Sequence, residues 1–139
     1  MKPFRVAIVG CGRISDLHQL GYRDNPDAVI AAVCDTNKAT AKKKAHDWGV
    51  EKVYSDYHQV LEDKDIDVVE LLTPHHLHCP MTVDACAAGK HVSVQKPMAL
   101  SAAEADQMIA AANKAGVVLR VYENFVHYAP AVKAKQMIE

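Results

Sequence analysis

The chain has 139 residues, with 16 Lys and Arg against 17 Asp and Glu, and a formal net charge of −1 at pH 7. This balance argues against a nucleic-acid-binding protein, which normally carries a basic excess or a basic stripe. Half of the residues (50%) are hydrophobic and 24% are charged, as is usual for a globular protein. The length predicts one domain that buries roughly two-thirds of its unfolded surface, so folding needs no disulfide or metal.

The cysteines and the N-terminus indicate a compartment. Cys11, Cys34, Cys79 and Cys86 show no CxxC spacing, which favours reduced thiols in a cytoplasmic protein. No segment approaches the roughly 18 apolar residues of a membrane helix, and residues 1–5 lack a signal-peptide layout. We therefore expect a cytoplasmic protein with no membrane or nucleic-acid partner.

Apolar runs alternate with helix-like segments along the chain. Strands are predicted at residues 5–9, 28–34, 52–54, 67–72, 91–95 and 117–122. Helices are predicted at about 13–23, 38–48, 57–62, 80–88 and 102–115, with a last one that begins near Pro130. This alternation predicts an α/β fold, a doubly wound parallel sheet with helices on both faces. In such sheets ligands bind beyond the carboxyl ends of the strands.

The first strand ends in the run Gly10-Cys11-Gly12-Arg13-Ile14-Ser15. It matches the GxGxxG dinucleotide fingerprint except for Ser15 at the third glycine. Gly10 would allow the tight turn, and Gly12 would let the backbone approach a pyrophosphate at the helix N-terminus. By itself the glycine pair also fits an ordinary strand-to-helix turn.

Asp35 ends the second strand and is followed by Thr36. An acidic side chain here can accept hydrogen bonds from the adenosine ribose and would repel a 2′-phosphate. The sequence therefore favours NAD over NADP. Lys38 and the lysines at 42–44 could soften this preference, although such a run is more typical of a solvated helix face.

Three histidines follow the fourth long apolar run, in Thr73-Pro74-His75-His76-Leu77-His78. Adjacent histidines converge poorly on one ion, and no Cys or carboxylate at ligand spacing completes a set. We predict a loop on the ligand rim and no metal site.

Lys96 follows the next strand, within Val94-Gln95-Lys96-Pro97. A lysine there can donate a proton or a hydrogen bond to a substrate oxygen. An ordinary surface lysine at a strand end is the alternative.

The order of these motifs resembles the N-terminal half of the Gfo/Idh/MocA oxidoreductases, the family of glucose–fructose oxidoreductase and inositol dehydrogenase. The resemblance spans essentially all 139 residues. It rests on the glycine turn, Thr73-Pro74 with His78, the run Ala88-Gly89-Lys90-His91-Val92, and Lys96-Pro97 followed by Ala99-Leu100-Ser101. The combination AGKHV with Lys-Pro is far more specific than the glycine motif.

The resemblance implies a nicotinamide-binding Rossmann domain with Lys96 as the catalytic lysine. Thr73, Pro74 and Asn124 would line the cofactor. The expected cofactor-binding residues are Gly10, Cys11, Gly12, Arg13, Ile14, Asp35, Thr36, Thr73, Pro74, His75, His78, Gln95, Lys96 and Asn124.

The chain departs from the family pattern in two ways. Gln95 stands where the family usually has Glu, which removes a charge beside Lys96, and His75 stands where Asn is usual. The family's second domain, which supplies most of the substrate pocket and the usual oligomer interface, is also missing. We expect residues 1–122 to form the dinucleotide-binding domain and residues 123–139 to begin the connection to that second domain.

The expected function is the cofactor half of an NAD(P)-dependent dehydrogenase that acts on a sugar, polyol or related hydroxy compound. The full-length protein would be a homo-oligomer, and this part alone would bind NAD without turnover. Two alternatives stay open: a non-enzymatic, repressor-like member that senses the dinucleotide and binds a protein partner, and a methyltransferase, which also pairs a glycine-rich turn with an acid.

Overall fold

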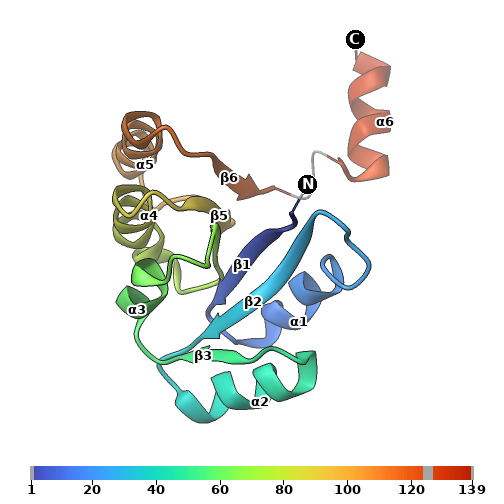
Figure 1. Cartoon of the computed structure of the whole chain (residues 1–139). Helices are drawn as coiled ribbons and strands as arrows, with labels where there is room; N and C mark the ends of the chain where they lie inside the picture. The colour runs from blue at the N-terminus through green and yellow to red at the C-terminus, as the bar shows by residue number, and fades with distance from the viewer. Residues whose placement is uncertain (1, 124–126, 139) are drawn as a thin grey trace.

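The structure is a computed structural model that describes residues 2–123 and 127–138. Its centre is a six-stranded parallel sheet with strand order β3-β2-β1-β4-β5-β6 (Figure 1). The strands are β1 (Phe4–Val9), β2 (Ala28–Cys34), β3 (Lys52–Tyr54), β4 (Val68–Leu71), β5 (His91–Gln95) and β6 (Leu119–Tyr122). The α-helices are α1 (Arg13–Leu20), α2 (Lys38–Trp48), α3 (Tyr57–Glu62), α4 (His78–Ala87), α5 (Ala102–Ala115) and α6 (Ala129–Ile138). The doubly wound α/β fold predicted from the sequence is confirmed.

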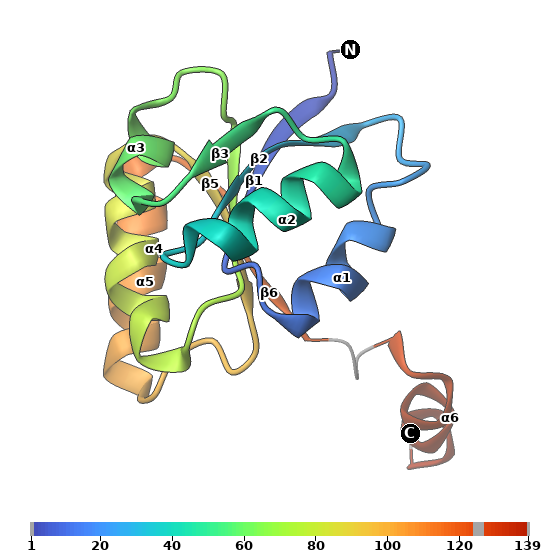
Figure 2. The same cartoon turned by 90° about the horizontal axis from the view of Figure 1, so that it is seen from below.

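Helices cover the two faces of the sheet unequally. Helices α1 and α2 lie on one face, and α3, α4 and α5 lie on the other (Figure 2). Strands β2 and β3 extend the sheet to one side of β1, and β4 to β6 extend it to the other. The strand order therefore reverses between β1 and β4, and the carboxyl ends of these two parallel strands form a topological switch point, the place where ligands bind in such sheets.

The core is built from small and β-branched side chains. Val69 and Leu71 of β4 and Val92 and Val94 of β5 are buried in the larger cluster, together with Met108 of α5. A second cluster joins β2 to the buried alanines of α2. The low aromatic content is thus compatible with a closely packed interior, because alanine lets helices approach the sheet.

Several element boundaries differ from the sequence prediction. Helix α1 ends at Leu20 and not near Arg23, because Gly21 starts a turn in which the Tyr22 N–H donates to the Gln19 carbonyl.

Every described residue of α6 is exposed. Across the described ranges, no helix is both long and apolar enough to cross a membrane.

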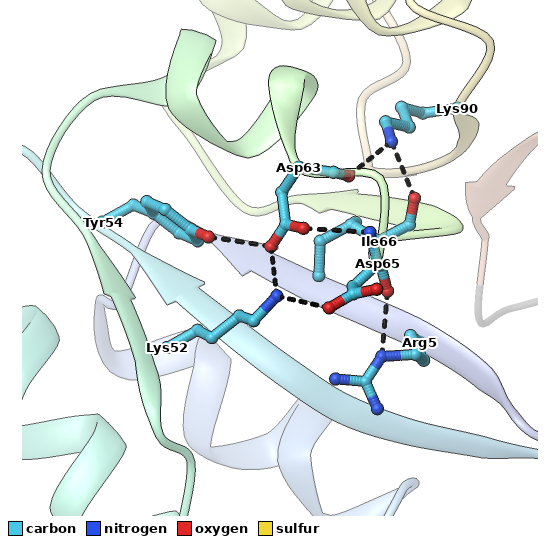
Figure 3. A network of polar contacts seen from close by, with 7 residues as sticks. All are labelled: Arg5, Lys52, Tyr54, Asp63, Asp65, Ile66 and Lys90. Carbon is cyan, nitrogen blue, oxygen red and sulfur yellow. Dashed lines mark hydrogen bonds and ion pairs between the residues drawn. The ribbon is translucent and has the colours of Figure 1, made fainter.

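A polar network ties the loop between α3 and β4 to the amino ends of the strands (Figure 3). Lys52 of β3 forms ion pairs with Asp63 at 2.7 Å and with Asp65 at 3.0 Å. Buried Lys90 donates to the Asp63 and Ile66 carbonyls, both at 2.8 Å. Lys90 belongs to the AGKHV run, so this part of the motif stabilises the end of the sheet opposite the expected site.

Candidate functional site

The turn after β1 contains two glycines with different roles. Gly10 has φ +96°, and a Cβ added there would lie 2.6 Å from the Leu72 carbonyl oxygen at the end of β4. Gly12 has an ordinary negative φ, and a Cβ there would meet no atom within 4 Å. Gly10 therefore allows the turn itself, whereas Gly12 leaves open space beside the N-terminus of α1.

The N-terminus of α1 is open to a ligand. Gly12 is the N-cap residue, and no side chain caps the helix. The Ser15 hydroxyl donates to the Gly12 carbonyl at 2.6 Å, and Ser15 is fully buried. Ser15 thus replaces the third glycine of the fingerprint without blocking the N–H groups of the first turn, which suit an anion.

Asp35 fixes the glycine turn from the end of β2. Its Oδ2 accepts a hydrogen bond from the Cys11 N–H and its Oδ1 accepts one from the Asn37 N–H, both at 2.8 Å. Each carboxylate oxygen keeps a second acceptor position. The carboxylate therefore orders the loop and can still accept hydrogen bonds from a ligand.

These residues surround a pocket of about 360 Å³, which we call the glycine-turn pocket. Six expected cofactor residues line it: Gly10, Gly12, Asp35, Thr36, Thr73 and Pro74. Ser55 and Tyr57, which the sequence analysis did not select, line it as well. The Thr73 Oγ1 is buried and has no hydrogen-bond partner in the described structure. Thr73 therefore brings an unpartnered polar group to the lining of the pocket.

His78 is a buried residue that connects two loops of the site. Its ring is 0% exposed, and its two nitrogens lie 2.9 Å from the Thr73 and Pro97 carbonyl oxygens. Both ring nitrogens are thus occupied, and His78 joins the loop after β4 to the loop after β5. His75 is exposed and lines a shallow hollow with Pro74, His76 and Leu100.

Lys96 opens onto a second pocket of about 580 Å³, which we call the Lys96 pocket. Of the expected residues, Ile14, Gln95 and Lys96 line it. The side chains of His18, Tyr22 and Tyr122 add polar groups that the sequence analysis did not select. Gly12 lines the first pocket and Ile14 the second, so the start of α1 stands between them.

A buried glutamate lies behind the Lys96 pocket. Glu70 of β4 is 0% exposed and contacts the His18 ring and the Tyr22 hydroxyl. Residues 67–72 are predicted from the sequence as a strand in an apolar run, and a buried carboxylate was not expected there. A lone acidic residue within the apolar run Val68-Val69-Glu70-Leu71-Leu72 was the available signal.

Three expected site residues contribute differently or lie outside the description. Cys11 is buried behind the turn and offers its backbone N–H to Asp35. Arg13 is exposed at the first position of α1. Asn124 lies outside the described residues. Among residues 2–123 and 127–138, no group of three or more His, Cys, Asp or Glu side chains is arranged to hold a metal ion.

The hydrogen-bonding groups of these two pockets are of the kinds that a dinucleotide needs. The open space beside Gly12, the uncapped α1 N-terminus and the free Thr73 hydroxyl suit phosphate and ribose oxygens. The Asp35 carboxylate suits ribose hydroxyls. Lys96 and Gln95 offer polar groups at the far side of the α1 N-terminus.

Comparisons with known proteins agree with this geometry. The model of the Gfo/Idh/MocA oxidoreductase family, NAD-binding Rossmann fold, matches residues 4–123. D-apiose dehydrogenase from Paraburkholderia graminis is 36% identical over 134 residues, which are 96% of this chain and 36% of the relative. Myo-inositol 2-dehydrogenase from Thermotoga maritima is 32% identical over 115 residues, 83% of this chain and 34% of the relative. The chain thus spans about a third of the length of these relatives.

Solved structures of oxidoreductases share the fold of this chain. A 3-ketoreductase from Actinomadura kijaniata, in complex with NADP and TDP-benzene, has a TM-score of 0.91 and 26% identity, covering 98% of this chain and 42% of that one. An oxidoreductase from Agrobacterium radiobacter, in complex with NAD⁺, L-tartaric acid and magnesium, has a TM-score of 0.84 and 30% identity, covering 88% and 36%. Similar structures therefore include complexes with both nicotinamide dinucleotides.

Proposed function

Because the chain belongs to the Gfo/Idh/MocA oxidoreductase family, we propose that it is the cofactor-binding part of a dehydrogenase for a sugar, polyol or related hydroxy compound. The observation that carries this proposal is the pairing of the glycine-turn pocket with the Lys96 pocket across the N-terminus of α1. Relatives named as dehydrogenases of D-apiose and myo-inositol support the substrate class. The family match also favours this function over a methyltransferase.

Each pocket has a separate task in this proposal. The glycine turn and the first N–H groups of α1 bind the pyrophosphate, the Asp35 carboxylate accepts hydrogen bonds from the ribose hydroxyls, and the Thr73 hydroxyl supplies a further hydrogen bond. A nicotinamide supplies the hydride acceptor when it is bound. Lys96 accepts the proton of the substrate hydroxyl during oxidation and returns it during reduction.

NAD is the proposed cofactor, because the Asp35 carboxylate would repel a 2′-phosphate. Two of the nearby lysines already form ion pairs with aspartates. Lys43 forms an ion pair with Asp47 at 2.6 Å. Lys44 forms an ion pair with Asp16 of α1, and its Nζ lies 5.5 Å from the centroid of the Trp48 ring. Lys44 is thus partly buried, unlike the solvated position expected for it. These pairs reduce the positive charge available to a 2′-phosphate.

A calorimetric titration of the chain with NADH, NADPH and S-adenosylmethionine tests the proposal. We expect NADH to bind with the highest affinity and S-adenosylmethionine not to bind. Gly12→Ala places a methyl group in the open space beside the α1 N-terminus and should weaken NADH binding about tenfold or more, equivalent to about 1.4 kcal/mol. Binding of S-adenosylmethionine alone would contradict the proposal.

Lys96→Met separates binding from chemistry. The variant should bind NADH with little change, while turnover in a protein that joins this chain to a substrate domain should fall by about two to four orders of magnitude, the usual contribution of general acid–base catalysis. Unchanged turnover would remove Lys96 from the mechanism. Without a substrate domain, we expect the chain to bind NADH and to catalyse no oxidation.

A further inference from the structure

A chain of hydrogen bonds leads from the buried Glu70 to the backbone of Lys96. Glu70 contacts His18 Nδ1 of α1, His18 Nε2 lies 2.9 Å from the Gln95 side-chain nitrogen of β5, and Gln95 Oε1 accepts from the Lys96 N–H at 2.8 Å. The three side chains come from three elements that meet only in the folded protein. Gln95 and His18 also line the Lys96 pocket.

The Lys96 N–H fixes the orientation of the Gln95 amide. A backbone N–H can only donate, so the Gln95 atom that faces it must be the oxygen. The Gln95 NH₂ group is then turned toward His18 and donates to its Nε2. A rotated amide would place two donors against each other and leave the Lys96 N–H unpaired.

This orientation determines the tautomer of His18. Because Nε2 accepts from Gln95, the ring proton of a neutral imidazole lies on Nδ1, where it donates to the Glu70 carboxylate. The Tyr22 hydroxyl donates to the other Glu70 oxygen. Burial, with the Glu70 carboxylate next, raises the pKa of both Tyr22 and Tyr122, so these hydroxyls stay protonated as donors.

The negative charge of this network lies on the buried Glu70 and not on residue 95. Gln95 carries no charge itself, but a buried carboxylate lies two hydrogen bonds away, at Glu70. Within the described residues, His18, Tyr22 and Tyr122 make polar contact with this carboxylate, and no Lys or Arg forms an ion pair with it. A buried acceptor with this arrangement orders its donors strongly, because each broken link leaves a buried group unpaired.

We propose that Glu70, His18 and Gln95 form a positioning relay that fixes the backbone at Lys96, with His18 held as the neutral Nδ1–H tautomer. The proposal rests on the proposed role of Lys96 in the reaction. His18 and Gln95 act through Lys96 as positioning residues. Glu70 supplies the charge that orients the relay, and Gln95 transmits this orientation because its amide both donates and accepts.

Gln95→Glu is the sharpest test, because it changes a donor to an acceptor with almost no change of shape. The carboxylate would place His18 between two acceptors, so its ring should carry protons on both nitrogens at about pH 7. Nitrogen-15 NMR of the chain reports this directly. We expect the Nδ1–H tautomer in the parent chain and the doubly protonated ring in Gln95→Glu.

Hydrogen exchange of the Lys96 amide tests the positioning itself. Gln95→Ala removes the acceptor and His18→Ala removes the group that holds the amide, so both should speed exchange at Lys96 about tenfold, as expected for one lost hydrogen bond. Gln19→Ala, next to His18 on α1, is the matched control and should leave Lys96 exchange unchanged. If His18→Ala fails to fold, the nitrogen-15 spectra of the parent chain and of Gln95→Glu still test the proposal.

Two results would overturn the relay: an Nε2–H tautomer of His18 in the parent chain, or unchanged Lys96 exchange in Gln95→Ala. Both measurements are made without cofactor. A failure of NADH to bind would instead contradict the proposed function. A relay confirmed by NMR in a chain that does not bind NADH would therefore show that the network is sound and that the assigned function is wrong.

Discussion

Gly10 packs so closely against Leu72 that a Cβ on Gly10 would lie 2.6 Å from the Leu72 carbonyl oxygen. The contact joins the carboxyl ends of β1 and β4, the two strands at the switch point of the sheet. Gly10 also has φ +96°, which side chains with a Cβ rarely adopt. The same position is thus restricted by space and by backbone conformation.

Gly10→Ala should destabilise the chain by about 3 kcal/mol, because strain at positive φ adds to a backbone clash. Thermal or urea unfolding followed by circular dichroism measures the change. Gly12→Ala is the matched control, since its Cβ would meet no atom within 4 Å and its φ is negative. Equal stability of the two variants would show that the turn relaxes away from Leu72.

Asp35→Asn should shift cofactor preference from NADH toward NADPH by about tenfold or more. The substitution removes the charge that repels a 2′-phosphate, and two charges about 4 Å apart near a protein surface interact by about 4 kcal/mol. The amide oxygen can still accept from one of the two N–H groups that Asp35 now serves. The ratio of the two dissociation constants reports the shift.

Asp47→Asn, on the exposed side of α2, is the control for Asp35. It removes one negative charge and the partner of Lys43, but it leaves the pocket intact. We expect less than a threefold change in the same ratio, which is below 1 kcal/mol. An equal effect of both substitutions would mean that net charge and not the Asp35 position sets the preference.

Asp63 should make stability fall in acid. Partial burial raises the pKa of Asp63, but hydrogen bonds from Lys52, the Asp65 backbone and Tyr54 outweigh it and bring the pKa to about 2. The folded pKa is below the value of about 3.9 in an unfolded chain. This contribution is therefore complete above about pH 4 and is lost as the pH falls toward 2.

Asp63→Asn should flatten this acid limb and reduce stability near neutral pH by about 1–3 kcal/mol, as expected for lost hydrogen bonds to a charged group. Urea unfolding at a series of pH values measures both effects. Glu62→Gln alters an exposed neighbour and serves as the control. An Asp63→Asn variant with the parent's acid limb would assign the pH dependence to other carboxyls.

Lys90→Met should reduce the free energy of unfolding by about 2–4 kcal/mol. The methionine fills similar space, but the Asp63 and Ile66 carbonyls lose their donor, and each unpaired buried group costs about 1–3 kcal/mol. Lys64→Met, at an exposed position in the same loop, should have little effect. NADH affinity should be retained, because Lys90 lies at the opposite end of the sheet from the pockets.

Cys11 and Cys34 should react slowly with thiol reagents in the folded chain. Burial raises the pKa of Cys11 to about 11 and that of Cys34 to about 12, so both stay protonated at about pH 8. All four cysteines are buried and free. Alkylation followed by mass spectrometry should modify them rapidly only after denaturation. Fast labelling of Cys11 in the folded chain would show that the glycine turn opens.

The sequence by itself determined the layers of the fold and the cofactor end of the site. Alternating apolar runs and capped helices are local signals, and each strand end places its next residue at the same edge of a parallel sheet. Gly10, Gly12 and Asp35 were identified in this way, Thr73 and Pro74 from the resemblance to the family, and all five line one pocket.

Only the tertiary structure decided how the other groups are used. His78 looked like a ligand-facing residue, but its ring is buried between two carbonyls, because the loops after β4 and β5 come together over it. Glu70 was not singled out from the sequence, and in the structure it is the centre of a network with His18 and Tyr22. These contacts join residues about 50 positions apart in sequence. No local period encodes them, because they depend on which face of the sheet α1 covers.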